Sequence, residues 1–255
     1  MSTGSHQRRE ELQRERGRER FEVWGETGCR HNAVMDEARW DAVDEYVTGL
    51  LVHEDEALKA ASRASDAAGL PAIAVTPAHG KLLHLLARMQ KASSILEIGT
   101  LGGYSTIWLA RALEPGGRVV TLEADPKHVK VARSNFERAH VSDRIDIRPG
   151  PAIDTLPTLT KDAPFDLVFI DADKPSTPAY FDWALRFSRP GTLILVDNVV
   201  RRGSLVEADS EDESVKAMRR LNESIAADRR VSATLIQTVG AKGYDGFLMA
   251  VIDAA

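Results

Sequence analysis

Two aspartates, an asparagine and a lysine stand directly after two apolar runs in this chain of 255 residues. Asp171 follows the run Leu167–Ile170, with Lys174 three residues later, and Asp197 and Asn198 follow the run 193–196. Short apolar runs of this kind are typical of buried strands. Because the carboxyl ends of parallel strands share one edge of a sheet, we expect these side chains to meet there.

These residue types predict a metal site and a base. Carboxylate and amide oxygens without His or Cys favour a hard divalent cation, so Asp171, Asp197 and Asn198 predict a site for Mg²⁺, with Mn²⁺ or Ca²⁺ as alternatives. The competing interpretation is that the two aspartates cap the helices that follow. Lys174 beside such a site is a candidate general base, and its alternative is a surface lysine or an ion pair with Asp173.

A glycine-rich turn and two acids predict a cofactor at the same edge. The segment "LEIGTLGGYS" contains Glu97 and Gly99, and glycine lets a backbone turn sharply and approach a ligand. The same glycines would also form a simple strand-to-helix turn. Glu97 disfavours a pyrophosphate and favours a cationic amino acid, while Glu123, which ends "RVVTLE", can accept both hydroxyls of a ribose. S-adenosylmethionine fits both acids, and NAD is the alternative.

The elements that position these residues alternate along the chain. From about residue 94, apolar runs of strand length alternate with helix-length segments, which predicts a parallel sheet covered on both faces. The last two runs, 231–239 and 245–252, are joined by a short loop and therefore pair antiparallel. Helical periodicity predicts three helices before the sheet, within 36–51, 55–69 and 77–92. We therefore expect an open α/β sheet with a reversed last strand.

The composition limits the classes of protein that fit. The segment 1–34 is rich in Arg and Glu and poor in apolar residues, so we expect a disordered tail there and a single domain over 35–255. The net charge of −5 gives no electrostatic reason to expect nucleic acid. No apolar run suits a membrane span and no signal-peptide pattern is evident. A single cysteine fits a reducing compartment, so we expect a cytoplasmic protein.

Five segments, in this order and spacing, resemble the cation-dependent O-methyltransferases, which include the caffeoyl-CoA and catechol O-methyltransferases. The segments are "ILEIGTLGGYS", "VVTLEAD", "RPGPAIDTLP", "FDLVFIDADK" and "ILVDNVV". The resemblance runs from about Trp40 to the C-terminus, and "DADK" followed by "DN" is its most specific part. It implies a Rossmann-like methyltransferase fold, S-adenosylmethionine and a divalent cation as cofactors, a small phenolic or catechol-like acceptor, and a homodimer.

The resemblance also implies roles for single residues. The implied metal ligands are Asp171, Asp197 and Asn198, and the implied catalytic residues are Lys174, which would deprotonate the acceptor hydroxyl, and Asp171. The residues implied in cofactor binding are Val75, Glu97, Gly99, Thr100, Ser105, Glu123, Ala152 and Asp171.

The chain departs from the plant members of that family after "DN". Those relatives carry a Leu-Trp-Asn stretch that contacts substrate, whereas this chain has "VVRRG" with Arg201 and Arg202. This difference argues against a caffeoyl-CoA-like substrate. The two arginines either attract a carboxylate or phosphate of another acceptor or are solvated loop residues.

Two other classes of function compete with a methyltransferase. An NAD-dependent oxidoreductase on the same sheet leaves Asp197 and Asn198 without a role. A non-catalytic S-adenosylmethionine-binding protein leaves Lys174 and the metal ligands without one. The sequence therefore predicts an O-methyltransferase that depends on S-adenosylmethionine and on a divalent metal.

Overall fold

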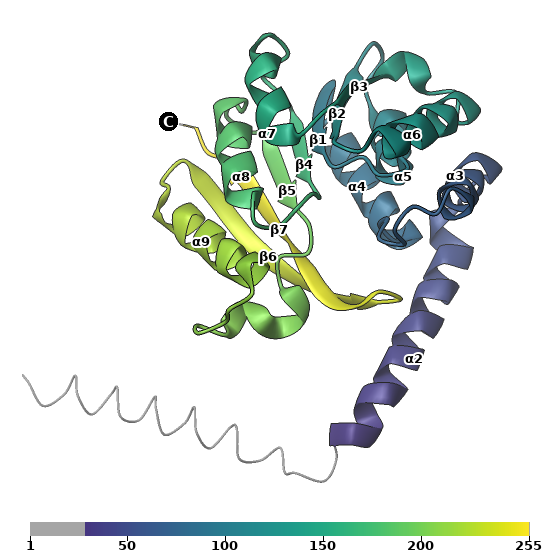
Figure 1. Ribbon diagram of the computed structural model, residues 1–255, viewed down its shortest axis with the longest axis vertical. Helices are drawn as coiled ribbons and strands as arrows, with labels where there is room; N and C mark the ends of the chain where they lie inside the picture. Colours follow the sequence, from purple (N-terminus) through teal and green to yellow (C-terminus); the bar gives the residue numbers. More distant parts are fainter. Residues whose placement is uncertain (1–28, 255) are drawn as a thin grey trace, which may run out of the picture.

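The structure, a computed structural model, describes residues 29–254 and has one central sheet (Figure 1). Seven strands lie in the order β3-β2-β1-β4-β5-β7-β6. The strands are β1 (Ser94–Ile98), β2 (Arg118–Glu123), β3 (Ile145–Pro149), β4 (Leu167–Ile170), β5 (Leu193–Val196), β6 (Val231–Gly240) and β7 (Gly243–Ile252).

The strand directions match the predicted fold. Strands β1 to β5 pair parallel, while β7 pairs antiparallel with both β5 and β6. The chain turns back within residues 240–243, which is too short for a helical crossover. The reversed strand therefore lies inside the sheet, between β5 and β6. The predicted Rossmann-like α/β fold with an antiparallel last strand is confirmed.

The register of the central strands sets the position of the residues that follow them. Ile98 pairs with Ile170, and Ile170 pairs with Val196. Strands β1, β4 and β5 consequently end at one level, and the next residue in each case is Gly99, Asp171 or Asp197. Side chains on adjacent strand ends lie within a few ångströms of one another.

Helices cover both faces of the sheet because successive strand side chains point to opposite faces. Ile95 belongs to the core beneath α3, α4, α5 and α6, whereas Leu96 belongs to the core beneath α8 and α9. The helices are α2 (Cys29–Val47), α3 (Glu56–Ala67), α4 (Pro77–Met89), α5 (Tyr104–Ala112), α6 (Pro126–Arg138), α7 (Ala152–Thr155), α8 (Thr177–Arg186) and α9 (Glu213–Ala227). Short turns are η1 (Thr48–Val52), η2 (Ser142–Arg144), η3 (Leu156–Lys161) and η4 (Arg201–Val206).

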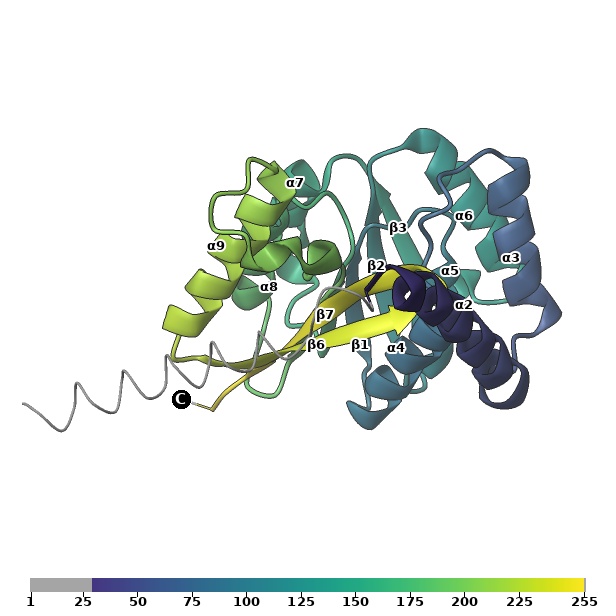
Figure 2. The ribbon, with the colours of Figure 1, turned by 90° about the horizontal axis from the view of Figure 1, so that it is seen from below.

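The N-terminal helix differs from the expectation. Helix α2 begins at Cys29, six residues before the predicted domain start, and it lies beside the β6–β7 hairpin (Figure 2). The predicted apolar face of this segment is not buried in the protomer, because Tyr46 and Leu51 remain 68% and 67% exposed. Residues 1–28 of the predicted tail lie outside the described residues. No helix among residues 29–254 is long and apolar enough to cross a membrane.

Candidate active site

A cavity of about 880 Å³ opens at the carboxyl ends of the central strands. Residues after β1, β2, β4 and β5 line it, together with the turn before α4 and the tip of the β6–β7 hairpin. A smaller cavity of about 280 Å³ lies against the hairpin and α4. The two cavities have five lining residues in common, namely Ile73, Val75, Thr76, Asn198 and Lys242.

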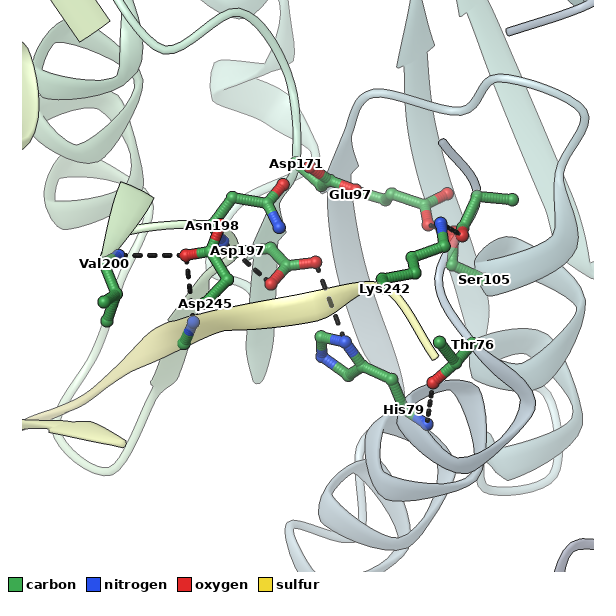
Figure 3. Close-up of polar contacts among 12 residues, drawn as sticks. Thr76, His79, Glu97, Ser105, Asp171, Asp197, Asn198, Val200, Lys242 and Asp245 are labelled. Atoms are coloured by element: carbon green, nitrogen blue, oxygen red, sulfur yellow. Dashed lines mark hydrogen bonds and ion pairs between the residues drawn. The ribbon is translucent and has the colours of Figure 1, made fainter. Parts of the chain in front are cut away.

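The three predicted metal ligands lie together at this edge (Figure 3). Asp171 lines the larger cavity, Asp197 lines the smaller one and Asn198 lines both. Asp197 is only 6% exposed. Burial raises the pKa of the Asp197 carboxyl, and the negative charge of Asp171 raises this pKa further, against the opposing effect of His79. A divalent cation would relieve the repulsion between the two carboxylates.

The chemistry of this donor set fits a hard cation. Among residues 29–254, His, Cys, Asp and Glu form no group of three or more that would hold a metal. The third oxygen donor here is instead the amide of Asn198, which suits Mg²⁺, Mn²⁺ or Ca²⁺. Asn198 has a positive φ of 55°, a conformation that asparagine adopts more readily than most residues.

The helix-cap alternative for the two aspartates finds no support in the described part of the chain. Asp197 Oδ1 accepts a hydrogen bond from the N–H of the adjacent Asn198 at 2.8 Å, and Asp171 accepts one from the Lys174 ammonium at 3.0 Å. Neither carboxylate there accepts a backbone N–H from a following helix. The carboxylate that accepts a backbone N–H just before α8 belongs to Asp173, whose Oδ2 accepts the Ser176 N–H at 3.1 Å.

Lys174 pairs with Asp171 and not with Asp173. Its side chain is only 10% exposed, and the residue lines the larger cavity. Asp173 instead accepts the Tyr180 hydroxyl at 2.6 Å. The predicted alternatives of a surface lysine and of a pair with Asp173 are therefore wrong.

Glu97 lies behind the cavity wall. It is fully buried, and its carboxylate accepts hydrogen bonds from the hydroxyls of Ser105 (2.7 Å), Thr106 (2.5 Å) and Thr121 (2.7 Å). Burial raises the pKa of Glu97 to about 7, although these three hydroxyls oppose the shift. Glu97 does not line the larger cavity, whereas Ser105 does. Direct contact between Glu97 and a cofactor stays a prediction.

Glu123 faces the larger cavity and also holds the glycine-rich turn. Its Oε2 accepts the backbone N–H groups of Thr100 (3.2 Å) and Leu101 (2.7 Å). Its Oε1 accepts the Asp125 N–H at 2.9 Å and lies 3.3 Å from His128 Nδ1. The acid predicted to bind a ribose is thus fixed in position by the loop that precedes α5.

The other predicted cofactor residues also border the larger cavity, which is lined by Val75, Gly99, Thr100, Ser105, Glu123, Ala152 and Asp171. Only glycine fits without strain at position 99, because its φ is +101° and a Cβ there would lie 2.0 Å from the Asp171 carbonyl oxygen. The close approach of β1 and β4 beyond their last residues therefore depends on Gly99.

Comparison with known proteins decides the family. A family model described as O-methyltransferase matches residues 50–249. The chain belongs to the O-methyltransferase family. It is 50% identical to a catechol O-methyltransferase of Niastella koreensis, over 86% of this chain and 100% of that protein. It is 54% identical to a catechol O-methyltransferase of Mycobacterium tuberculosis, over 82% and 94% of the two chains.

A solved structure supports the same family. The O-methyltransferase from Bacillus cereus, described in complex with SAH, is 56% identical and has a TM-score of 0.83, covering 85% of this chain and 99% of that chain. The predicted resemblance and the predicted enzyme class are confirmed. Membership of the O-methyltransferase family removes the NAD-dependent oxidoreductase and the non-catalytic protein as alternatives.

Three residues of this O-methyltransferase lie at the site although no sequence pattern predicted them there. His79, in the first turn of α4, lies with Nδ1 3.7 Å from Asp197 Oδ2. Asp245 Oδ1 accepts the backbone N–H groups of Val200 (3.1 Å) and Arg201 (3.0 Å), and so fixes the loop after β5. Lys242, at the hairpin tip, lines both cavities. These residues come from segments that only tertiary packing brings to the strand ends.

The two adjacent arginines of the "VVRRG" segment have different surroundings in the structure. Arg201 lines the larger cavity, and its Nε is buried without a hydrogen-bond partner. Arg202 is exposed and does not line that cavity. Arg201 is therefore the arginine available to a ligand of this O-methyltransferase.

Proposed function

We propose that this O-methyltransferase transfers the methyl group of S-adenosylmethionine to a hydroxyl of a catechol-like or phenolic small molecule, with a divalent cation, Mg²⁺ in first place. The observation that carries the proposal is the meeting of Asp171, Asp197 and Asn198 (Figure 3), next to the cavity that Glu123 and Ser105 line. The SAH of the Bacillus cereus relative supports the choice of cofactor. The names of the two curated relatives support a catechol-type acceptor.

The position of each residue in the site suggests which part of the cofactor or the cation it would bind. Glu123 would accept hydrogen bonds from the ribose hydroxyls, and Ser105 would bind the amino acid end of the cofactor, so that the methyl group points toward Asp171. Asp171, Asp197 and Asn198 would hold the cation. When bound, the cation supplies Lewis-acid stabilisation of the acceptor oxyanion.

In its neutral amine form, Lys174 Nζ, which lies 3.0 Å from Asp171 Oδ1, would take the proton of the acceptor hydroxyl and become an ammonium. The acceptor oxygen then forms a bond to the methyl carbon, and the electron pair of the broken carbon–sulfur bond stays on sulfur. Much of the acceleration arises from holding the two substrates in line.

The protein's partners are part of the proposal. Exposed apolar side chains on α2 and η1 support a second copy of the chain as a partner, namely Val43, Tyr46, Leu50 and Leu51. The net charge of −5 supports a small-molecule acceptor over nucleic acid. A cytoplasmic location stays a prediction.

Removal of the cation tests the proposal. Excess EDTA should abolish methyl transfer to catechol and Mg²⁺ should restore it, while calorimetry should show that SAH still binds in EDTA. The variant Asp197→Asn, which keeps the size and removes the charge, should lower kcat/KM by about 100-fold or more. Asp182→Asn, on the exposed face of α8, is the control and should leave activity unchanged. Full activity toward catechol in excess EDTA would contradict the proposed metal.

A further inference from the structure

Lys242 stands at the tip of the β6–β7 hairpin (Figure 3) and lines the larger cavity. Its ammonium donates a hydrogen bond to the carbonyl of Ala74, in the turn before α4. The preceding residue, Ala241, donates its backbone N–H to Asp44 Oδ2 of helix α2 at 2.9 Å. The backbone of the hairpin tip is therefore bonded to α2, and the Lys242 side chain is bonded to the turn before α4.

The cations that line the larger cavity differ in their partners. Lys174 is bonded to Asp171, and His128 lies beside Glu123. Lys242 and Arg201 form no ion pair with a carboxylate of the described residues, although both line the cavity. Arg201 belongs to the loop after the metal ligands, whereas Lys242 lies at the Ala74 side of the cavity. A cation in the cavity wall without an ion-pair partner favours an anionic group of a ligand placed next to it.

The cofactor that we propose carries such a charge, in the carboxylate of its amino acid end. With the ribose at Glu123 and the methyl group near Asp171, the amino acid end extends toward the remaining wall, which includes Thr76, Ser105 and Lys242. Ser105 donates its hydroxyl hydrogen to Glu97, which leaves its oxygen to accept the cofactor's ammonium. The carboxylate then requires donors of its own.

Thr76 and Lys242 are suitable donors for a carboxylate. Thr76 Oγ1 accepts the His79 N–H at 3.2 Å, so the hydroxyl hydrogen of Thr76 is available to donate. Thr76 also caps the N-terminus of the thirteen-residue helix α4, an end that favours negative charge. The Lys242 ammonium lies on the same turn, at the Ala74 carbonyl.

We propose that Lys242 binds the carboxylate at the amino acid end of the cofactor and so ties the β6–β7 hairpin to the occupied cofactor site. This inference rests on the proposed function for the identity of the cofactor. Because Lys242 also lines the smaller cavity, the bound cofactor holds one wall of the space beside the metal ligands in place.

Calorimetry in EDTA, without an acceptor, measures the proposed contact between Lys242 and the cofactor carboxylate alone. The two probes are SAH and S-adenosyl-3-thiopropylamine, which lacks only the carboxylate. Wild-type protein should bind SAH more tightly than the decarboxylated probe. Lys242→Met should weaken SAH about 10- to 100-fold, the range for a charge-assisted hydrogen bond, and should change the affinity for the decarboxylated probe less than about 3-fold.

Two further variants complete the experiment. Arg202→Met removes an exposed positive charge outside the cavity and should leave both affinities unchanged, while Lys242→Arg should recover part of the affinity for SAH. An equal loss for both probes in Lys242→Met would overturn the inference in favour of a purely structural hairpin.

The remaining outcomes also decide the question. Unchanged SAH affinity in Lys242→Met, with a raised KM for 3,4-dihydroxybenzoate but not for catechol, would overturn the inference and place Lys242 against an acidic acceptor. If wild-type protein bound neither probe, the proposed cofactor would fail and the inference with it. SAH binding by wild-type protein without methyl transfer to any catechol would contradict only the proposed acceptor, and the comparison of the two probes would still decide the role of Lys242.

Discussion

Glu97 shows how one buried acid can serve a cavity that it does not line. Its three hydroxyl donors all point at the carboxylate, and one of them, Ser105, forms the cavity wall. The acid therefore fixes the Ser105 hydroxyl in the wall of the cavity where we propose that the cofactor binds. The same burial makes Glu97 hard to ionise and links the stability of the protein to pH.

The pH dependence of unfolding should report this acid. The pKa of Glu97 is raised from 4.5 to about 7, so its contribution to stability is complete below pH 4.5 and is lost as the pH rises toward 7. The loss should be on the order of 2–3 kcal/mol. In Glu97→Gln the free energy of unfolding should depend less on pH across this window. Urea unfolding of both proteins at pH 5 and 7.5 measures the difference, and parallel pH profiles would contradict it.

The residue scale also shows what the sequence allowed us to predict. Asp171, Asp197 and Asn198 follow strands that end in register, so their meeting could be inferred from the apolar runs alone. His79 and Lys242 could not be found in this way. They lie on a helix and on a hairpin whose packing against the strand ends depends on long-range contacts that leave no local pattern.

At the scale of elements, the strand ends of β1 and β4 approach each other so closely that Gly99 has no room for a side chain. A Cβ there would lie 2.0 Å from the Asp171 carbonyl oxygen, in a backbone with φ of +101°. Gly99→Ala should therefore lower the free energy of unfolding by about 1–3 kcal/mol through backbone strain, and by a further amount because β4 must move. The movement of β4 should also displace Asp171.

A second glycine, Gly116, allows the cost of backbone strain to be measured without the cost of moving β4. Gly116 also has a positive φ, of +79°, but a Cβ there would meet no atom within 4 Å. Gly116→Ala should therefore show the backbone strain alone. Urea unfolding of both variants, with methyl-transfer rates alongside, measures the contrast. Equal destabilisation and equal activity in the two variants would show that the approach of β1 and β4 does not constrain the site.

The contact between α2 and the hairpin tip is the second feature at this scale. Asp44 Oδ2 accepts the Ala241 N–H, and a Cβ at Gly240 would lie 2.5 Å from the same oxygen, so the two elements touch closely. Asp44→Ala should free the tip, speed hydrogen exchange at Ala241 and raise the KM of the acceptor several-fold. Asp41→Ala, at an exposed position of the same helix, is the control. Unchanged exchange at Ala241 in Asp44→Ala would show that this contact does not hold the hairpin.

The elements themselves were predicted to different degrees. Strands and their directions followed from apolar runs and from loop lengths, because burial on both faces leaves a continuous apolar signal. Helix α2 was expected from its periodicity, but its start and the exposure of its apolar residues were not. Periodicity shows that a helix has an apolar face and does not show what covers that face.

At the scale of the whole molecule, the exposed apolar residues of α2 and η1 should decide the oligomeric state. If a second copy covers them, light scattering should give twice the protomer mass of 28.0 kDa for wild-type protein. A double variant with Tyr46→Glu and Leu51→Glu should shift the population toward the monomer, since two charges would be buried in the interface. Met89→Glu, at a side chain 79% exposed on α4, controls for the loss of an exposed apolar group. A wild-type monomer would contradict the proposed homodimer.

The five lining residues common to the two cavities have a consequence for inhibition. If the cofactor occupies the larger cavity and the acceptor the smaller one, as we propose, these shared residues place the two molecules side by side, and one linked molecule should reach both. An adenosine joined to a catechol by a short linker would place both ends at once, and the second end would bind at the high effective concentration that the first end creates. For such a bisubstrate ligand the best linker is the one whose length matches the span from Glu123 to the Asn198 amide. A series of linkers would therefore measure, in solution, how far apart this enzyme holds its two substrates.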